Sequence, residues 1–181
     1  MRGKGALWLT LAAGAAMLAL YLAYPLTGDD YAYANTFRTV DGFDGPWPLE
    51  RFYRWYPFHW LRANGRLANF IAMCSLTFLP KWLTAMVMGA ATWGWMALVL
   101  RLGGAWRGRL AAAAGAVFYM AAVFPWWDLM YTVDFNFNYP VAACAGLGAV
   151  WIWRRYGGVK RRWMRWLCLA AAFAGGAFHE S

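Results

Sequence analysis

Residues 82–109 read WLTAMVMGAATWGWMALVLRLGGAWRGR, an uncharged stretch over residues 82–100 followed by a loop with three arginines and no acid. A helix of nineteen such residues reaches about 28 Å, which is enough to cross the hydrocarbon core of a bilayer. Cytoplasmic loops of membrane proteins carry an excess of lysine and arginine. The stretch therefore predicts a membrane helix whose basic end faces the cytoplasm.

Four further apolar stretches predict the remaining membrane helices. They cover residues 6–24, 110–125, 139–153 and 163–178. We expect an all-α membrane protein with about five transmembrane helices, folded as a single transmembrane module over residues 1–181. The first stretch is longer than the core of a typical signal peptide, so we expect an uncleaved helix.

Acidic and basic residues alternate from loop to loop. Eleven of the seventeen basic residues lie in residues 1–4, 101–109 and 154–165, which contain no acid. The other loops hold all eight acids: Asp29, Asp30, Asp41, Asp44, Glu50, Asp128, Asp134 and Glu180. The lysine and arginine bias places the N-terminus in the cytoplasm and the acidic loops on the extracytoplasmic side.

The composition also favours a membrane chain. It is 62% hydrophobic and 14% charged, whereas soluble domains carry about 25% charged residues. The net charge of +9 sits in short loops beside apolar stretches, so it indicates topology and attraction to lipid headgroups, with no nucleic-acid partner expected. The three cysteines lie inside or beside apolar stretches and are interpreted as small buried side chains.

The first outer loop, residues 25–66, is the longest polar segment. Its four prolines rule out a single helix, and two amphipathic pieces, residues 29–38 and 49–63, are predicted to lie at the membrane interface. Residues 67–79 are apolar but too short for a span, which favours an interfacial or re-entrant segment.

Asp29 and Asp30 directly follow the first membrane helix. An aspartate at the centre of a membrane helix costs about 2.5–3.5 kcal/mol, so carboxylates close to hydrocarbon usually have a function. Catalysis or metal binding by at least one of them is one hypothesis, and capping of the helix at 29–38 is the other. Adjacent side chains point in different directions on a helix, so one can cap while the other faces a cavity.

Arg62-Ala63-Asn64-Gly65-Arg66 is a second candidate, because arginines bind phosphate through paired hydrogen bonds. The alternative, favoured by the segment taken alone, is that both arginines reach lipid headgroups while Asn64-Gly65 forms a turn.

Two further polar pairs stand at predicted helix ends. Asn138 is expected to cap the helix that Tyr139 and Pro140 open, with a sugar contact as the weaker interpretation. Nearby Asp134 is interpreted as a solvated loop residue. His179-Glu180 closes the chain at an outer helix end, where a His–Glu pair can bind metal or transfer protons, although a single pair is a weak signal.

The order of these motifs resembles a known superfamily. A basic N-terminus, one helix, Gly28-Asp29-Asp30-Tyr31 and then Trp60-x3-Asn64-Gly65-Arg66 is similar to the start of bacterial polytopic GT-C-type glycosyltransferases. The likeness is greatest to an uncharacterised branch, which the Asn138-Tyr139 and His179-Glu180 pairs also resemble. Because five spans are too few for the full bundle, we expect the chain to be the N-terminal portion of a longer protein.

The resemblance implies a bacterial inner-membrane enzyme that transfers a sugar from a polyprenyl-phosphate donor to an extracytoplasmic acceptor. Asp29 or Asp30 would be the general base or the ligand of a divalent metal ion. Arg66, with Arg62 as the second candidate, would hold the donor phosphate, and Asn64 would belong to the same substrate-binding site. Asn138, Tyr139, His179 and Glu180 would line the same cavity.

Two other classes of function stay open. A transporter or flippase fragment would use the same aspartates and arginines to bind substrate or protons. The ionisable groups of transporters tend to lie at the bilayer midplane, whereas Asp29 and Asp30 are predicted at the membrane interface, which favours the enzyme. A membrane scaffold without chemistry is the second alternative. Soluble-type nucleotide or protease chemistry has no support, since Walker, GxGxxG, HExxH, GxSxG and CxxC motifs are absent from the sequence.

The charge pattern makes a prediction about topology. A membrane-impermeant thiol reagent added to intact cells should label a cysteine placed at Thr27, and should leave one at Gly157 in the arginine-rich turn unlabelled until the cells are opened. Labelling of Gly157 but not of Thr27 in intact cells would reverse the orientation and remove the basis for an outward-facing site.

Overall fold

The computed structural model describes residues 3–39, 57, 61, 66–107, 109–123, 132–156 and 162–178. All regular secondary structure within these residues is helical. The all-α fold class is thus confirmed for the part of the chain that the structure describes.

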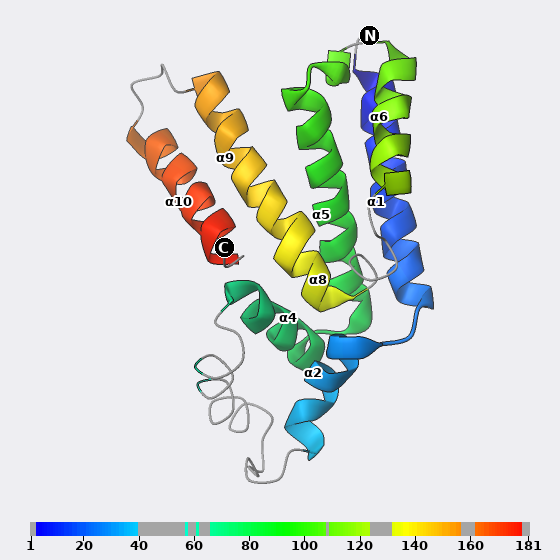
Figure 1. Cartoon of the computed structure of the whole chain (residues 1–181), viewed down its shortest axis with the longest axis vertical. Helices are drawn as coiled ribbons and strands as arrows, with labels where there is room; N and C mark the ends of the chain where they lie inside the picture. Colours follow the sequence, from blue (N-terminus) through cyan, green and yellow to red (C-terminus); the bar gives the residue numbers. More distant parts are fainter. Residues whose placement is uncertain are drawn as a thin grey trace.

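Long helices lie side by side along the long axis of the molecule (Figure 1). They are α1 (Lys4–Ala23), α5 (Lys81–Leu102), α6 (Leu110–Val123), α9 (Ala142–Tyr156) and α10 (Arg162–Phe178). α6 packs on α1, α1 on α5, α5 on α9 and α9 on α10, so the bundle is a row of neighbouring helices. A short helix η1 (Ala105–Arg107) links α5 to α6.

Two of these helices are long and apolar enough to cross a membrane, α1 and α5. The helices α6 and α10 have 14 and 17 residues, which is below the usual length of about 20. α9 has 15 residues of its own but continues an unbroken helical stretch that begins at Val133. Large apolar side chains nevertheless face outward on α1, α6 and α10, among them Trp8, Phe118 and Phe173. The number of five spans stays a prediction.

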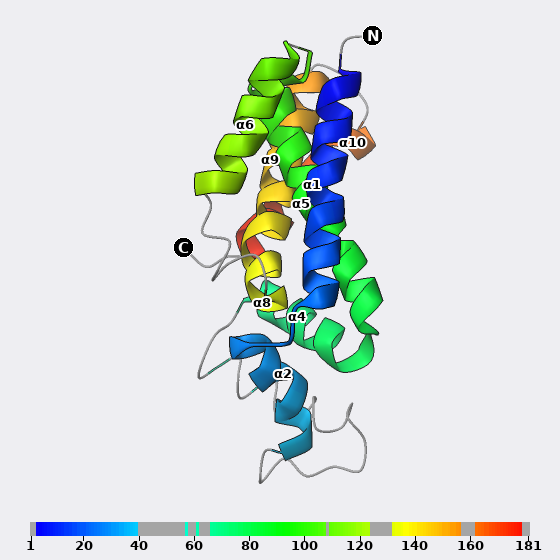
Figure 2. The same ribbon diagram turned by 90° about the vertical axis from the view of Figure 1, so that its right-hand side faces the viewer.

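Shorter helices close one end of the bundle (Figures 1 and 2). They are α2 (Gly28–Thr39), α4 (Leu67–Phe78), α8 (Val133–Asn136) and the π-helical turn η2 (Phe137–Val141), which joins α8 to α9 without a break. The helix predicted over residues 29–38 is confirmed, and the apolar segment after Arg66 forms a separate helix that contacts α8, η2 and α10. The second predicted interfacial helix, residues 49–63, falls outside the described residues.

Charged residues separate between the two ends of the bundle. The basic end lies at the start of α1, around η1, at the end of α9 and at the start of α10, and it carries Lys4, Arg101, Arg107, Arg109, Arg154, Arg155, Arg162 and Arg165. The opposite end carries Asp29, Asp30 and Asp134, together with Arg66 and Lys81. We call these the basic end and the acidic end.

The centre of the bundle depends on the close approach of α1 and α5. Residues at helical spacing on α1, including Thr10, Gly14 and Met17, are buried against α5. A Cβ atom added to Gly14 would lie 2.6 Å from the carbonyl oxygen of Gly89, and one added to Gly89 would lie 2.7 Å from that of Gly14. Small residues at this crossing let the two backbones touch, as is common between membrane helices.

Buried hydroxyl groups along this interface are satisfied within their own helices. Thr10 donates to the carbonyl oxygen of Ala6 at 3.0 Å, and Thr92 donates to that of Met88 at 3.0 Å. These two hydroxyl groups therefore need no water to complete their hydrogen bonds, which suits helices in a bilayer.

Substitution at this crossing should destabilise the bundle. Gly14→Ala forces a methyl group onto the α5 backbone, and we expect a loss of about 1–3 kcal/mol in the free energy of unfolding. Gly115→Ala is the matched control, because a Cβ there meets nothing within 4 Å. Thermal unfolding in detergent compares the two, and a Gly14→Ala midpoint equal to that of Gly115→Ala would contradict the close packing.

Candidate functional site

Polar side chains gather at the acidic end, where α2, α4 and α8 meet. We call this group the polar cluster, and each of its members is at least nine-tenths buried: Asp30, Asn69, Thr132, Asp134, Asn136 and Asn138. Buried polar groups are costly unless they form hydrogen bonds, so the contacts within the cluster decide its structure.

Asp30 anchors the cluster by capping a helix from another part of the chain. Its carboxylate accepts hydrogen bonds from the backbone N–H groups of Val133 and Asp134, the second at 2.9 Å. The first N–H groups of a helix have no partner within the helix, and the side chain of Thr132, which precedes α8, makes no capping hydrogen bond. Asp30 therefore fixes α2 to the start of α8.

This cap corrects the predicted start of the fourth long helix. Asn138 was expected to cap a helix opening at Tyr139, but the helix begins at Val133, and Asn138 lies within η2. The earlier start is possible because Asp30 satisfies the first N–H groups. The wider π-helical turn accommodates Pro140, which has no N–H to donate.

Asn138 instead joins three helices by hydrogen bonds. Its amide nitrogen lies 2.8 Å from Oδ1 of Asn69, 2.9 Å from the carbonyl oxygen of Asp134 and 3.2 Å from Oδ1 of Asp134. Two amide hydrogens serve these three acceptors, so one bond is shared. Asn69 in turn donates to the hydroxyl oxygen of Tyr33 at 3.1 Å, which extends the network from η2 through α4 to α2.

The cluster also contains buried atoms that no other described residue satisfies. They are both amide atoms of Asn136, Oγ1 of Thr132, Oδ1 of Asn138 and the Nε atom of neighbouring Arg66. An unsatisfied buried polar group costs about 1–3 kcal/mol. The cluster therefore has hydrogen-bonding capacity for water, for a ligand or for another part of the chain.

Three carboxylates lie within electrostatic reach of one another. Burial raises the pKa of Asp30 to about 7, assisted by the charges of Asp134 and Asp29 and opposed by the two backbone hydrogen bonds. Burial and the charge of Asp29 raise the pKa of Asp134 to about 6, whereas Arg66 and Asn138 lower it. Asp29 itself is exposed. The site thus combines one exposed carboxylate with two buried carboxyl groups whose pKa values are raised by burial.

The structure places the predicted site residues in different environments. Asp29 and Asp30 point in different directions, as expected for neighbours on a helix, and only Asp30 is buried. Arg66 lies at the start of α4 and is half-buried, and Tyr139 stacks its ring on Phe135 with centroids 5.9 Å apart. Four predicted site residues lie outside the described residues: Arg62, Asn64, His179 and Glu180.

Sequence reasoning missed several members of the site. The interpretation of Asp134 as a solvated loop residue is wrong, because its side chain is 5% exposed and lies in a helix. Its spacing of four residues from Asn138 is a helical signal that would have paired the two side chains. Asn69 is a lone amide in an apolar stretch, which is also a recognisable signal.

A metal site is not assembled from the described residues alone, since no group of three or more histidine, cysteine, aspartate and glutamate side chains is arranged there to hold an ion. Both oxygens of Asp30 accept backbone hydrogen bonds. Of the two aspartates predicted as possible metal ligands, Asp29 is therefore the one with an accessible carboxylate.

Comparisons of the chain with protein-family models, with curated proteins and with solved structures give no match.

The buried carboxyl groups predict an unusual dependence of stability on pH. A carboxyl group whose pKa is raised by folding binds more protons in the folded state, so the free energy of unfolding should fall as the pH rises from about 4 to about 7. Thermal unfolding in detergent at several pH values measures this slope, and the difference between the parent chain and Asp30→Asn isolates the contribution of Asp30. If the free energy of unfolding changed with pH equally in the parent chain and in Asp30→Asn, the raised pKa of a buried Asp30 carboxyl group would be contradicted.

Proposed function

We propose that this chain acts in a membrane glycosyltransferase that moves a sugar from a polyprenyl-phosphate donor to an acceptor on the extracytoplasmic face. The motif order described above suggests the reaction class. The observation that carries the proposal is the position of exposed Asp29 beside a buried, hydrogen-bonded polar cluster at the acidic end of an apolar helical bundle.

Asp29 is the preferred general base of this reaction. A general base must come within hydrogen-bond distance of the acceptor hydroxyl, which requires an accessible carboxylate. Asp29 is exposed on the first turn of α2, whereas Asp30 is 1% exposed and holds the backbone of α8. We therefore assign catalysis to Asp29 and positioning of α2 to Asp30.

Arg66 is the proposed phosphate ligand. Its Nε atom is buried without a partner among the described residues, and its charge lowers the pKa of Asp134, so the guanidinium group lies close to the cluster. Such a group can stabilise the negative charge that grows on the donor phosphate as the glycosidic bond breaks. Arg62, Asn64, Asn138, Tyr139, His179 and Glu180 stay in the proposed cavity on the resemblance alone.

The proposed location is the bacterial inner membrane, with the N-terminus in the cytoplasm and the acidic end outside. Two candidate spans and the separation of charge between the two ends support this arrangement. A divalent metal ion bound through Asp29 is compatible with the proposal.

A transporter or flippase fragment is the second candidate. Two buried carboxyl groups that titrate near neutrality, beside a π-helical turn, favour proton-coupled movement of a substrate. This candidate assigns function to Asp30 and Asp134, whereas the glycosyltransferase assigns it to Asp29.

The two candidates differ in their response to single substitutions. Asp29→Asn should lower the transfer of labelled hexose or pentose from polyprenyl-phosphate donors by about 10²-fold or more, with unchanged thermal stability, because the general base is lost while Asp30 still holds α8. Asp44→Asn, the same change in the same predicted outer loop, is the matched control. The assay uses membranes that contain the full-length protein.

Transfer that is undiminished in Asp29→Asn, or absent from the parent protein with every donor tested, would refute the glycosyltransferase. Proton-coupled uptake into proteoliposomes that is lost in Asp134→Asn and retained in Asp29→Asn would favour the transporter instead.

A further inference from the structure

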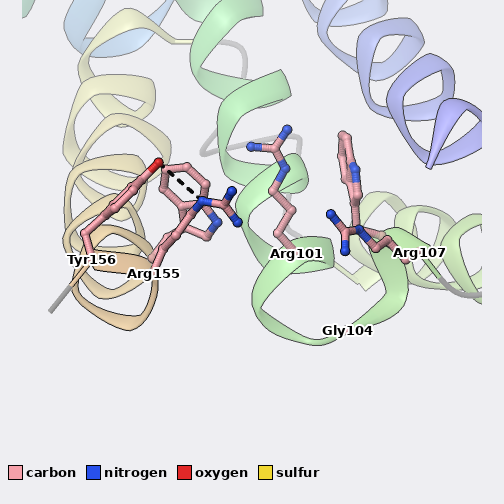
Figure 3. A pocket seen from close by; sticks show the side chains of 7 residues that line it. Arg101, Gly104, Arg107, Arg155 and Tyr156 are labelled. Atoms are coloured by element: carbon pink, nitrogen blue, oxygen red, sulfur yellow. Dashed lines mark hydrogen bonds between the residues drawn. The ribbon is translucent and has the colours of Figure 1, made fainter. Parts of the chain in front are cut away.

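The basic end of the bundle contains an open pocket of about 520 Å³ between α5, η1 and the end of α9 (Figure 3). Three arginines and three aromatic residues line it: Arg101, Arg107, Arg155, Trp106, Trp151 and Tyr156. It lies at the opposite end of the bundle from the polar cluster, so it is independent of the proposed catalytic site.

The pocket concentrates positive charge without a compensating acid. Its lining contains three guanidinium groups and no carboxylate, and the loops 101–109 and 154–165 contain no acid anywhere in their sequence. An adjoining pocket of about 290 Å³ is lined by Arg101, Arg154 and Arg155, which extends the same positive surface. Like charges in a concave site repel one another and raise the local concentration of anions.

Aromatic contacts hold the arginines in place. The Arg101 guanidinium carbon lies 4.4 Å from the centre of the Trp106 ring and 5.7 Å from that of Trp151, so this side chain bridges η1 and α9. Arg155 donates from Nε to the hydroxyl oxygen of Tyr156 at 3.3 Å. Figure 3 shows Arg155 extending from α9 toward Arg101. Cation–π contacts use the faces of the tryptophan rings, and the Arg101 side chain is exposed at the pocket.

We propose that this pocket binds a phosphate-bearing anion through Arg101 and Arg155, with Arg107 as a further contact. Guanidinium groups form paired, charge-assisted hydrogen bonds with phosphate oxygens. The volume suits a phosphate headgroup or a small phosphate compound. Tryptophan and tyrosine are also enriched at the headgroup level of membranes, and basic pockets between helices bind anionic headgroups there.

The phosphate can come from a lipid or from solution, and two arms of one experiment distinguish them. In the first arm, the full-length protein in phosphatidylcholine nanodiscs is compared with and without cardiolipin, and native mass spectrometry counts the retained cardiolipin. In the second arm, inorganic phosphate and pyrophosphate are titrated onto the protein in zwitterionic detergent, and thermal stability reports binding.

Arg101→Gln with Arg155→Gln should weaken binding in the responsive arm by about tenfold or more, because charge-assisted hydrogen bonds are lost. Arg109→Gln with Arg162→Gln is the matched control, since it removes the same charge from exposed positions at the same end but outside the pocket. The control should change binding by less than about twofold if binding is local to the pocket.

Arg155→Gln alone keeps the contacts of Arg101 with Trp106 and Trp151, so this single variant tests the site if the double variant does not fold.

Retention of cardiolipin only, or a response to soluble phosphate only, identifies the source of the phosphate and supports the site. Equal losses in the pocket variants and the control pair would show dispersed surface attraction and overturn the proposal, as would the absence of binding in both arms. Asp29→Asn should leave binding unchanged, so failure here is distinguishable from failure of the proposed glycosyltransferase.

Discussion

The carboxylate of Asp30 and the backbone N–H groups of Val133 and Asp134 form the contact on which the acidic end depends. It joins α2 to α8, although these segments lie far apart in the sequence. By satisfying the first N–H groups of α8, it lets the helix begin before Pro140 and brings Asp134 and Asn138 inside the fold. The buried position raises the pKa of Asp30, so the same contact that orders the site also makes its stability sensitive to pH.

The two ends of the bundle use charge in different ways. At the acidic end, the carboxyl groups of Asp30 and Asp134 are buried together with several amides, and a hydrogen-bonded network joins α2, α4 and η2. At the basic end, the arginines stay exposed, and Arg101 and Arg155 also contact aromatic side chains. The apolar centre, where Gly14 meets Gly89, separates these regions.

Asp29 and Asp30 differ in burial, and this difference suggests different functions for the two side chains. The exposed carboxylate can reach a substrate, whereas the buried one fixes the helix that carries it. Under the glycosyltransferase proposal, the hydrogen bonds of the polar cluster position the helices that carry Asp29 and Arg66. The unsatisfied amide of Asn136 gives the same region capacity for further hydrogen bonds.

The sequence by itself determined the helical class and the approximate bounds of the long helices, because apolar stretches between charged loops have few other stable structures. It also separated the basic end from the acidic one, and it singled out Asp29, Asp30 and Arg66. Only the tertiary structure decided which aspartate is buried, where α8 begins, and that Asn69, Asp134 and Asn138 meet. These outcomes depend on contacts between α2, α4 and α8. The spacing of residues within one segment does not indicate which distant backbone N–H groups a carboxylate will bind. The arginine pocket has the same origin, since Arg101 and Trp151 become neighbours only when α5 packs against α9.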